Sequence, residues 1–218
     1  MLAVAPAQER ASFRGPGVLP AAGGAGEDHQ VNLLLKLARS IDWVNDKVGR
    51  AALWLVLLAS LISAGNAISR YGFNLSSNAM LEVQWYLFSA VFLLCSGYTF
   101  LRNEHVRIDL VSNRLTAKGR NWVDIVGIVL FLLPVCVMLV TMSWPSFVES
   151  YVNDEQSSNA GGLIRWPVRL LIPVGFTLLG LQAVSELIKR IAFVAGRAPD
   201  PLTKGGHVGA HADAEGAK

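Results

Sequence analysis

The stretch Ile125–Trp144 (IVGIVLFLLPVCVMLVTMSW) contains twenty residues, and none of them carries a charge. At about 1.5 Å of rise per residue, a helix of this length covers the roughly 30 Å of hydrocarbon in a bilayer. Its apolar side chains surround the whole helix, so the stretch lacks the polar face that a helix in a soluble bundle needs. It therefore predicts a membrane-spanning helix.

Three more stretches of nineteen residues each are similarly apolar: Ala51–Ser69, Val83–Leu101 and Trp166–Val184. Arg169 is the one charged residue within them. The whole chain is 52% hydrophobic and 16% charged, whereas soluble domains carry about 25% charged residues. We therefore predict an all-α integral membrane protein with four transmembrane helices, which make up one domain over residues 51–194.

Tryptophan and the basic residues predict the boundaries and the direction of the spans. All six tryptophans lie within a few residues of a span end, where their amphipathic rings favour the headgroup layer. Every Lys and Arg except Arg70, Arg165 and Arg169 lies on one side of the predicted topology. The positive-inside rule assigns that side to the cytoplasm, so both termini are expected there.

The segments outside the spans are of two kinds. Residues 1–30 and 195–218 are rich in Gly, Ala and Pro, and are expected to be disordered cytoplasmic tails. Residues 31–50 place apolar side chains at helical spacing and charged ones mostly elsewhere, which predicts an amphipathic helix on the inner membrane surface. Membrane lipids are therefore an expected partner, with the basic side chains of this helix meeting anionic headgroups. The alternative is that this segment simply extends the first span into the cytoplasm.

The composition of the chain and the motifs that it lacks disfavour several functional classes. A net charge of +3 is too small for a nucleic-acid-binding footprint, and two cysteines, Cys95 and Cys136, provide no disulfide scaffold. All four histidines lie outside the spans, which argues against a haem held at membrane depth. The chain contains no Walker loop, zinc-protease motif or serine elbow. We therefore expect no enzymatic activity, and no cofactor, metal, catalytic or substrate-binding residues.

Two charged residues close to the outer boundary are candidates for a specific role. Glu82 and Arg169 each lie near the start of a span that runs inwards, and an ionisable residue at this depth is costly unless it is paired or faces a polar cavity. Three interpretations stay open: both side chains reach the headgroups, they form structural pairs within or between subunits, or they belong to a transport site. Two deeper polar residues, Asn66 and Gln182, are more typical of interhelical hydrogen bonds.

The inner loop after the second span begins Arg102-Asn103-Glu104-His105-Val106-Arg107-Ile108-Asp109-Leu110. If this segment is helical, Arg102, His105 and Asp109 share one face at spacings of three and four. No nucleophile or metal ligand accompanies them, so a loop that docks on a partner is favoured over acid–base chemistry.

The two outer loops share a short sequence. Ser76-Ser77-Asn78-Ala79 and Ser157-Ser158-Asn159-Ala160 each precede a tryptophan by the same offset. Such an echo fits a parallel repeat of two helix hairpins, but the favoured interpretation is that Ser and Asn independently cap two helix starts.

Taken together, these features resemble the DctQ-like small membrane subunit of tripartite ATP-independent periplasmic (TRAP) transporters, over about residues 33–194. Arg70-Tyr71 resembles the family's RY step after span one, and Glu82 its acidic residue at the start of span two. The loop from Arg102 to Leu110 is similar to the family's R-x-x-H-(I/V)-x-(V/I)-D pattern, and Ile172-Pro173-Val174-Gly175-Phe176 to its fourth-span motif. The outer loops look most like the branch labelled for mannitol or chloroaromatic compounds.

The resemblance implies a complex of three components in the bacterial inner membrane and periplasm. A periplasmic solute-binding protein captures an organic acid or related solute, and a separate large permease subunit imports it using an ion gradient. The small subunit is expected to support the large one. The resemblance implies that it makes no substrate contacts and that the following residues serve assembly and interfaces: Arg70, Glu82, Arg102, His105, Asp109 and Arg169.

A rival prediction is a small exporter that works alone, formed by two copies of the four-helix chain around a membrane glutamate, with Glu82 in that role. The boundary position of Glu82 and the length of the chain disfavour this alternative.

Overall fold

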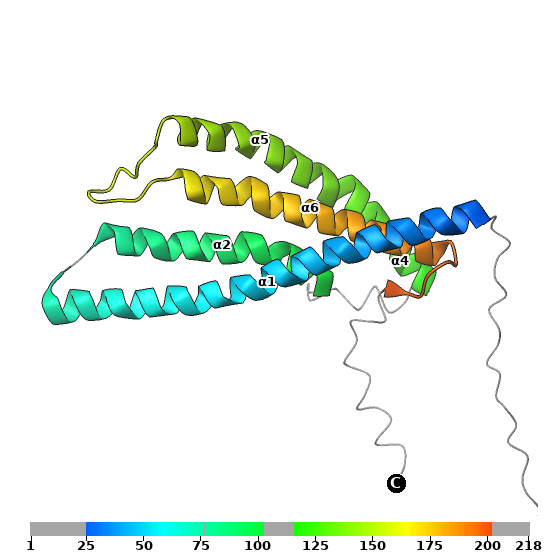
Figure 1. Cartoon of the computed structure of the whole chain (residues 1–218), viewed down its shortest axis with the longest axis horizontal. Helices are drawn as coiled ribbons and strands as arrows, with labels where there is room; N and C mark the ends of the chain where they lie inside the picture. Colours follow the sequence, from blue (N-terminus) through cyan, green and yellow to red (C-terminus); the bar gives the residue numbers. More distant parts are fainter. Residues whose placement is uncertain (1–24, 76, 103–115, 202–218) are drawn as a thin grey trace, which may run out of the picture.

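The computed structural model of the chain describes residues 25–75, 77–102 and 116–201. Four long helical rods lie side by side (Figure 1), and each is long and apolar enough to cross a membrane. The rods are α1 (Ala25–Phe73), α2 (Asn78–Arg102), a third rod running from Ala117 to Val152, and α6 (Trp166–Val194). Each rod contains one of the four predicted spans, so the predicted fold class is confirmed.

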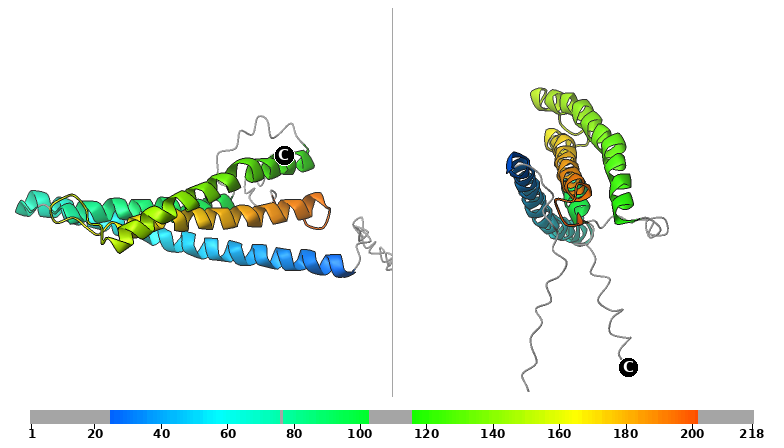
Figure 2. Two further views of the ribbon diagram at one scale, coloured as in Figure 1. Left: turned by 90° about the horizontal axis from the view of Figure 1, so that it is seen from above. Right: turned by 90° about the vertical axis from the view of Figure 1, so that its right-hand side faces the viewer.

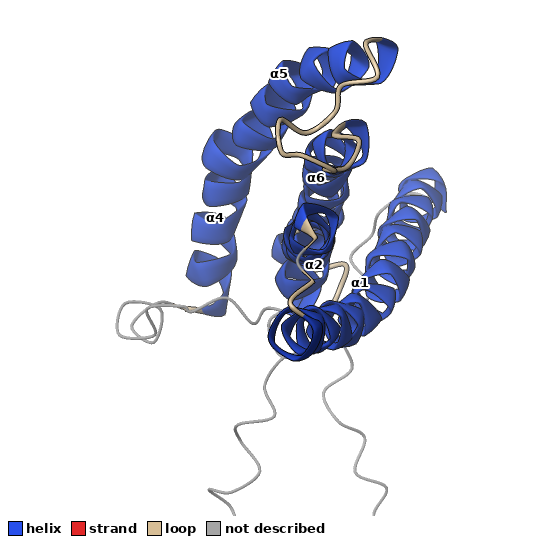
Figure 3. Cartoon of the chain, turned by 90° about the vertical axis from the view of Figure 1, so that its left-hand side faces the viewer, coloured by secondary structure: helices blue, strands red, loops and turns tan. Residues whose placement is uncertain are grey.

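The rods form a layer, with α1 and α5 (Leu133–Val152) at its two edges and α2 and α6 between them (Figures 1 and 3). Helix α6 packs against α1, α2 and α5, and so connects the whole assembly. The end of α1 at Phe73, the start of α2 at Asn78 and the segment 153–165 lie at one end of the rods, which we call the loop end. The first turns of α1, the last turns of α6 and α4 (Ala117–Gly127) lie at the opposite end, the tail end.

Small residues allow the backbones of α1, α2 and α6 to approach closely. Gly97 on α2 faces the Asn45 side chain and the Leu178 carbonyl, and Gly175 on α6 lies against Leu93. Ala52, Ala59, Ala90 and Ala183 are also buried. Because lipid tails are as apolar as leucine, helices in a bilayer associate through such close packing rather than by removing large apolar side chains from water.

The third rod changes its helical form before a proline. Helix α4 is followed by one π-helical turn, η1 (Ile128–Leu132), and Pro134 lies at the start of α5. A proline ring lacks the amide hydrogen and clashes with the carbonyl four residues earlier, so a wider turn accommodates it. The rod curves along its length (Figure 2).

The segment expected to be a separate surface helix is continuous with the first span. Helix α1 runs for 49 residues without interruption and begins at Ala25, within the range expected to be a tail. Its first half packs on α6, so residues 31–50 continue the first span as a helical extension. Whether this extension lies on the membrane surface stays a prediction.

Residues 195–201, expected to belong to a disordered tail, are folded. Gly196 ends α6 with a φ of 73°, and the amide of Arg197 donates to the Ala192 carbonyl at 2.9 Å. This left-handed turn is a common helix C-terminus, because glycine adopts it without steric cost. It returns the chain to α4, where Asn121 donates to Asp200 at 3.2 Å. The other residues of the two predicted tails, 1–24 and 202–218, lie outside the described part of the chain.

Candidate functional site

Residues 153–165 form a short hairpin between α5 and α6 at the loop end. Gln156 and Ile164 make an antiparallel bridge, and the Ser157 amide donates to the Leu163 carbonyl at 2.9 Å. Gly161 has a φ of 70°, in the left-handed region that favours glycine, and it allows the chain to reverse. The hairpin is thus a defined structure rather than an open loop.

The carboxylate of Glu82 holds this hairpin to α2. Glu82 is 1% exposed. Its Oε1 accepts hydrogen bonds from Asn159 Nδ2 at 2.9 Å and from the Ser157 hydroxyl, and its Oε2 accepts one from the Leu163 amide at 2.6 Å. An ionised carboxylate only accepts hydrogen bonds, and three donors from one hairpin satisfy both oxygens. Glu82 therefore has a structural role within this chain.

Two neighbours of Glu82 on α2 make further contacts with the hairpin. Asn78 Nδ2 donates to the Ala160 carbonyl at 3.0 Å, and the Tyr86 hydroxyl donates to the Ile164 carbonyl at 3.2 Å. The side chains of residues 78, 82 and 86, which share one face of α2, therefore all bind the hairpin.

This arrangement corrects the interpretation of the second Ser-Ser-Asn-Ala stretch. Helix α6 begins at Trp166, after Arg165, and no side chain caps its start. Ser157 and Asn159 instead direct their polar groups at Glu82. They lie seven or more residues before the helix, too far to reach its first amides. The two Ser-Ser-Asn-Ala stretches are in contact through the hydrogen bond from the Asn78 side chain to the Ala160 carbonyl.

Arg169 pairs with the same hairpin but not with Glu82. Its Nη2 donates to Glu155 Oε1 at 2.7 Å, and its Nη1 donates to the carbonyl and hydroxyl oxygens of Ser146 at 3.2 and 3.0 Å. Arg165 also lies 3.5 Å from Glu155. Of the interpretations left open, the structure supports internal structural pairing, with the hairpin as the common partner of Glu82 and Arg169.

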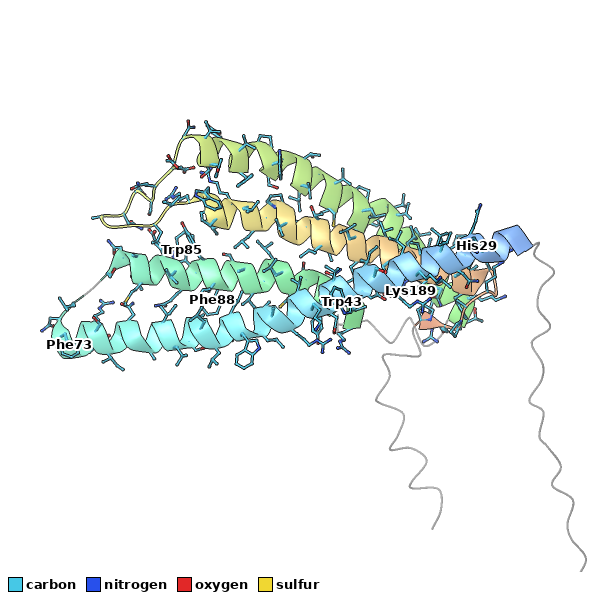
Figure 4. The ribbon with its side chains drawn as sticks, in the orientation of Figure 1. His29, Trp43, Phe73, Trp85, Phe88 and Lys189 are labelled. Carbon is cyan, nitrogen blue, oxygen red and sulfur yellow. The ribbon has the colours of Figure 1, made fainter. Side chains whose placement is uncertain are left out.

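A second polar cluster, between α1 and α6 at the tail end, was not predicted as a unit. Asp42 on α1 accepts hydrogen bonds from Gln182 Nε2 at 2.8 Å, the Ser185 hydroxyl at 2.7 Å and Lys189 Nζ at 3.1 Å. Asn45 donates to Gln182 at 3.0 Å. The expectation that Gln182 forms interhelical hydrogen bonds is therefore confirmed. Figure 4 shows Lys189 on α6 where α1 passes it.

The cluster continues from α6 to α4. Arg190 is 1% exposed and pairs with Asp124 on α4 and with Glu186, which is itself bound by Lys189. Lys189 and Arg190 lie three and four residues after Glu186, a spacing that the sequence displays. The sequence could not show that Asp42 and Asp124 lie opposite them, because these residues are far away along the chain.

The remaining candidates have different surroundings. Arg70 is exposed near the end of α1. Arg102 pairs with Asp46 on α1 at 2.9 Å, and its guanidinium lies 5.2 Å from the centre of the Tyr98 ring. His105 and Asp109 lie outside the described residues, so their predicted shared face is not tested. Within the described ranges, no three His, Cys, Asp or Glu side chains are arranged to hold a metal ion.

A comparison with known families adds to this geometry. Residues 59–193, which include Glu82, the hairpin and most of α6, match the model of the DctQ component of tripartite ATP-independent periplasmic transporters. The chain belongs to the DctQ family. It is a multi-pass protein of the inner membrane and a small permease subunit of the TRAP type, which is not a class of enzyme.

One relative supports the assignment to the DctQ family. A Haemophilus influenzae protein named as a TRAP transporter small permease is 22% identical over 152 residues, which are 70% of this chain and 92% of that protein. No solved structure matches the chain. The DctQ match begins at residue 59, so Asp42 and Asn45 of the tail-end cluster lie outside it.

Proposed function

We propose that this DctQ-family chain supports a separate large permease subunit, which imports an organic acid or related solute from the periplasm using an ion gradient. A periplasmic solute-binding protein delivers the solute in this proposal. The observation that supports this accessory role is that the charged side chains bind to other parts of the same chain. Glu82, Arg169, Asp42 and Arg190 each bind other residues of this chain and so fix the arrangement of its helices.

Transport requires polar groups that can exchange between the solute or ion and water. Glu82 is the acidic residue that the exporter alternative needs, and both of its oxygens are occupied by the hairpin. To bind a transported ion, Glu82 would have to release the hairpin and leave the Leu163 amide without its acceptor. This arrangement favours the accessory subunit over the exporter.

We further propose that the two ends of the rods have separate roles in assembly. Glu82 and Arg169 shape the hairpin, which provides a fixed surface on the periplasmic side. Arg70, exposed at the same end, adds a positive charge to that surface. At the cytoplasmic side, Arg102 and the following residues His105 and Asp109 form a contact with the large subunit. The orientation rests on the distribution of Lys and Arg.

The direct test is purification of the tagged chain from its native membrane in a mild detergent. We expect a large multi-span permease to co-purify in a fixed ratio. Glu82→Ala should lower this ratio, because the hairpin loses its support, whereas Glu149→Ala, which removes an exposed carboxylate from α5, should leave it unchanged. A chain that purifies alone, or only as a dimer of itself, would contradict the proposal and favour the exporter.

A further inference from the structure

The first half of α1 carries a stripe of exposed basic residues. Lys36, Arg39, Trp43, Lys47 and Arg50 are all exposed and follow each other at spacings of three and four, so they share one side of the helix. Lys47 Nζ lies 5.9 Å from the centre of the Trp43 ring. We call the four basic residues, together with Trp43 between them, the basic stripe.

The two acidic residues between Lys36 and Arg50 are turned away from the basic stripe or are already paired. Asp42 faces α6, where it binds Gln182, Ser185 and Lys189. Asp46 pairs with Arg50 and with Arg102 of α2. In the sequence both acidic residues lie between Arg39 and Lys47, but the fold directs one towards α6 and the other towards Arg102. Between residues 36 and 50 the exposed side of α1 therefore carries net positive charge, to which Arg102 contributes.

Contacts with α6 indicate the depth of the basic stripe. Asn45 lies beside Leu178 and Gln182, and Asp42 lies beside Ser185. The apolar run of α6 ends at residue 184, so this part of α1 lies where α6 leaves the hydrocarbon layer. Trp43, 62% exposed, has an amphipathic ring suited to this layer (Figure 4).

An apolar strip runs beside the basic stripe on the same exposed part of α1. Leu33, Leu37 and Val44 are 52%, 52% and 40% exposed and lie on one line at spacings of four and seven. A surface with adjacent apolar and basic strips matches the boundary between acyl chains and headgroups. A soluble acidic partner would match the charges but would leave the leucines exposed to water.

We propose that the basic stripe binds the phosphate groups of anionic phospholipids in the leaflet at the tail end. In this arrangement Lys36, Arg39, Lys47 and Arg50 contact the headgroups, Trp43 lies among them, and the neighbouring apolar strip contacts the acyl chains. The proposal concerns the isolated chain and does not depend on the transport partner.

The experiment measures lipid binding to the full chain in mild detergent by native mass spectrometry. Phosphatidylglycerol and phosphatidylcholine are titrated separately, because they differ in net headgroup charge. We expect tighter binding of phosphatidylglycerol. Arg39→Gln/Lys47→Gln should weaken it about fivefold for each charge removed at low salt, so roughly twenty- to thirtyfold for the pair. Neither side chain has an acidic partner among the described residues, so the fold should be retained.

The matched control is Arg70→Gln/Lys118→Gln, which removes one exposed Arg and one exposed Lys from other positions. It should leave phosphatidylglycerol binding within about twofold of the parent chain. Equal binding of the two lipids by the parent, or an equal loss in the control, would overturn the proposal. Displacement of phosphatidylglycerol by the same concentration of inorganic phosphate would also overturn it, since a free anion would then suffice. Unchanged lipid binding by Arg39→Gln/Lys47→Gln, with loss of a co-purifying protein, would assign the basic stripe to a protein partner instead.

Discussion

Glu82 and Arg169 are both charged residues near the start of an inward span, yet they use the hairpin differently. Glu82 enters the hairpin and accepts hydrogen bonds from its backbone and side chains. Arg169 binds Glu155, near the start of the hairpin, and also binds Ser146 on α5, so that it links the hairpin to that helix. Together they attach the hairpin to three helices.

Glu82→Gln should loosen the hairpin while leaving the four helices in place. The amide keeps one acceptor oxygen but presents an NH₂ group to donors, so at least one of the three hydrogen bonds to the hairpin is lost. Limited proteolysis in detergent should show faster cleavage within residues 153–165. The control Glu149→Gln changes an exposed side chain and should be cleaved at the parent rate. Equal cleavage of the two variants would contradict the role given to Glu82.

Pairs of helices in this chain depend on two kinds of contact. Along most of their length α1, α2 and α6 meet through small residues that allow close approach. At the tail end, α1 and α6 instead meet through Asp42, Gln182, Ser185 and Lys189. Close packing suits the hydrocarbon layer, whereas charge pairing suits the region where helices extend beyond it.

Gly175→Ala should destabilise the contact between α2 and α6. An added Cβ would lie 2.7 Å from Leu93 Cβ and 2.9 Å from the Leu93 carbonyl oxygen, and the backbone carbonyl cannot rotate away. Overpacking of this kind typically costs about 1–3 kcal/mol, which should lower the unfolding temperature in detergent by several degrees. Gly65→Ala is the matched control, because a Cβ there meets nothing within 4 Å. It should be neutral or slightly stabilising, since alanine is the better helix former. Equal unfolding temperatures for the two variants would contradict the close contact.

Asp42→Asn should weaken the attachment of α1 to α6. The substitution keeps the shape of the side chain but removes the charge that binds Lys189, and one of its oxygens becomes a donor group. We expect a loss of about 1–3 kcal/mol, measured as a lower unfolding temperature in detergent. In a double-mutant cycle with Lys189→Gln, the combined loss should be smaller than the sum of the single losses. Additive losses would show that the two residues are not coupled. Asp154→Asn, at an exposed position whose left-handed φ also suits Asn, is the matched control.

The whole molecule has two chemically different ends. The loop end carries the hairpin, and the tail end carries the charge cluster, the basic stripe and both ends of the described chain (Figure 1). The exposed surface of the four rods between them is largely apolar. This division fits a membrane protein whose two aqueous faces meet different partners.

Labelling of single cysteines should establish the orientation of the chain. In a Cys95→Ala/Cys136→Ala background, Ser158→Cys in the hairpin should react with a membrane-impermeant maleimide in spheroplasts. Ala195→Cys, exposed after α6, should react only after the membrane is permeabilised. The reason is the concentration of Lys and Arg at the tail end, which the positive-inside rule assigns to the cytoplasm. The reverse pattern of labelling would contradict the predicted direction.

The sequence alone determined the four apolar spans and their approximate positions, because a span is recognised by a local property, the length of an apolar run. The resemblance in Arg70, Glu82 and the fourth-span motif also indicated the family. Local patterns could not decide how the helices rotate about their axes or which charges meet. Asp42 and Lys189 are 147 residues apart and Glu82 and Leu163 are 81 apart, so only packing brings them together. The tertiary structure likewise decided that Asp42 faces α6 and that the basic side chains of residues 36–50 face away from the other helices. A sequence shows which residues share a side of a helix, but only the neighbouring helices determine which side is buried.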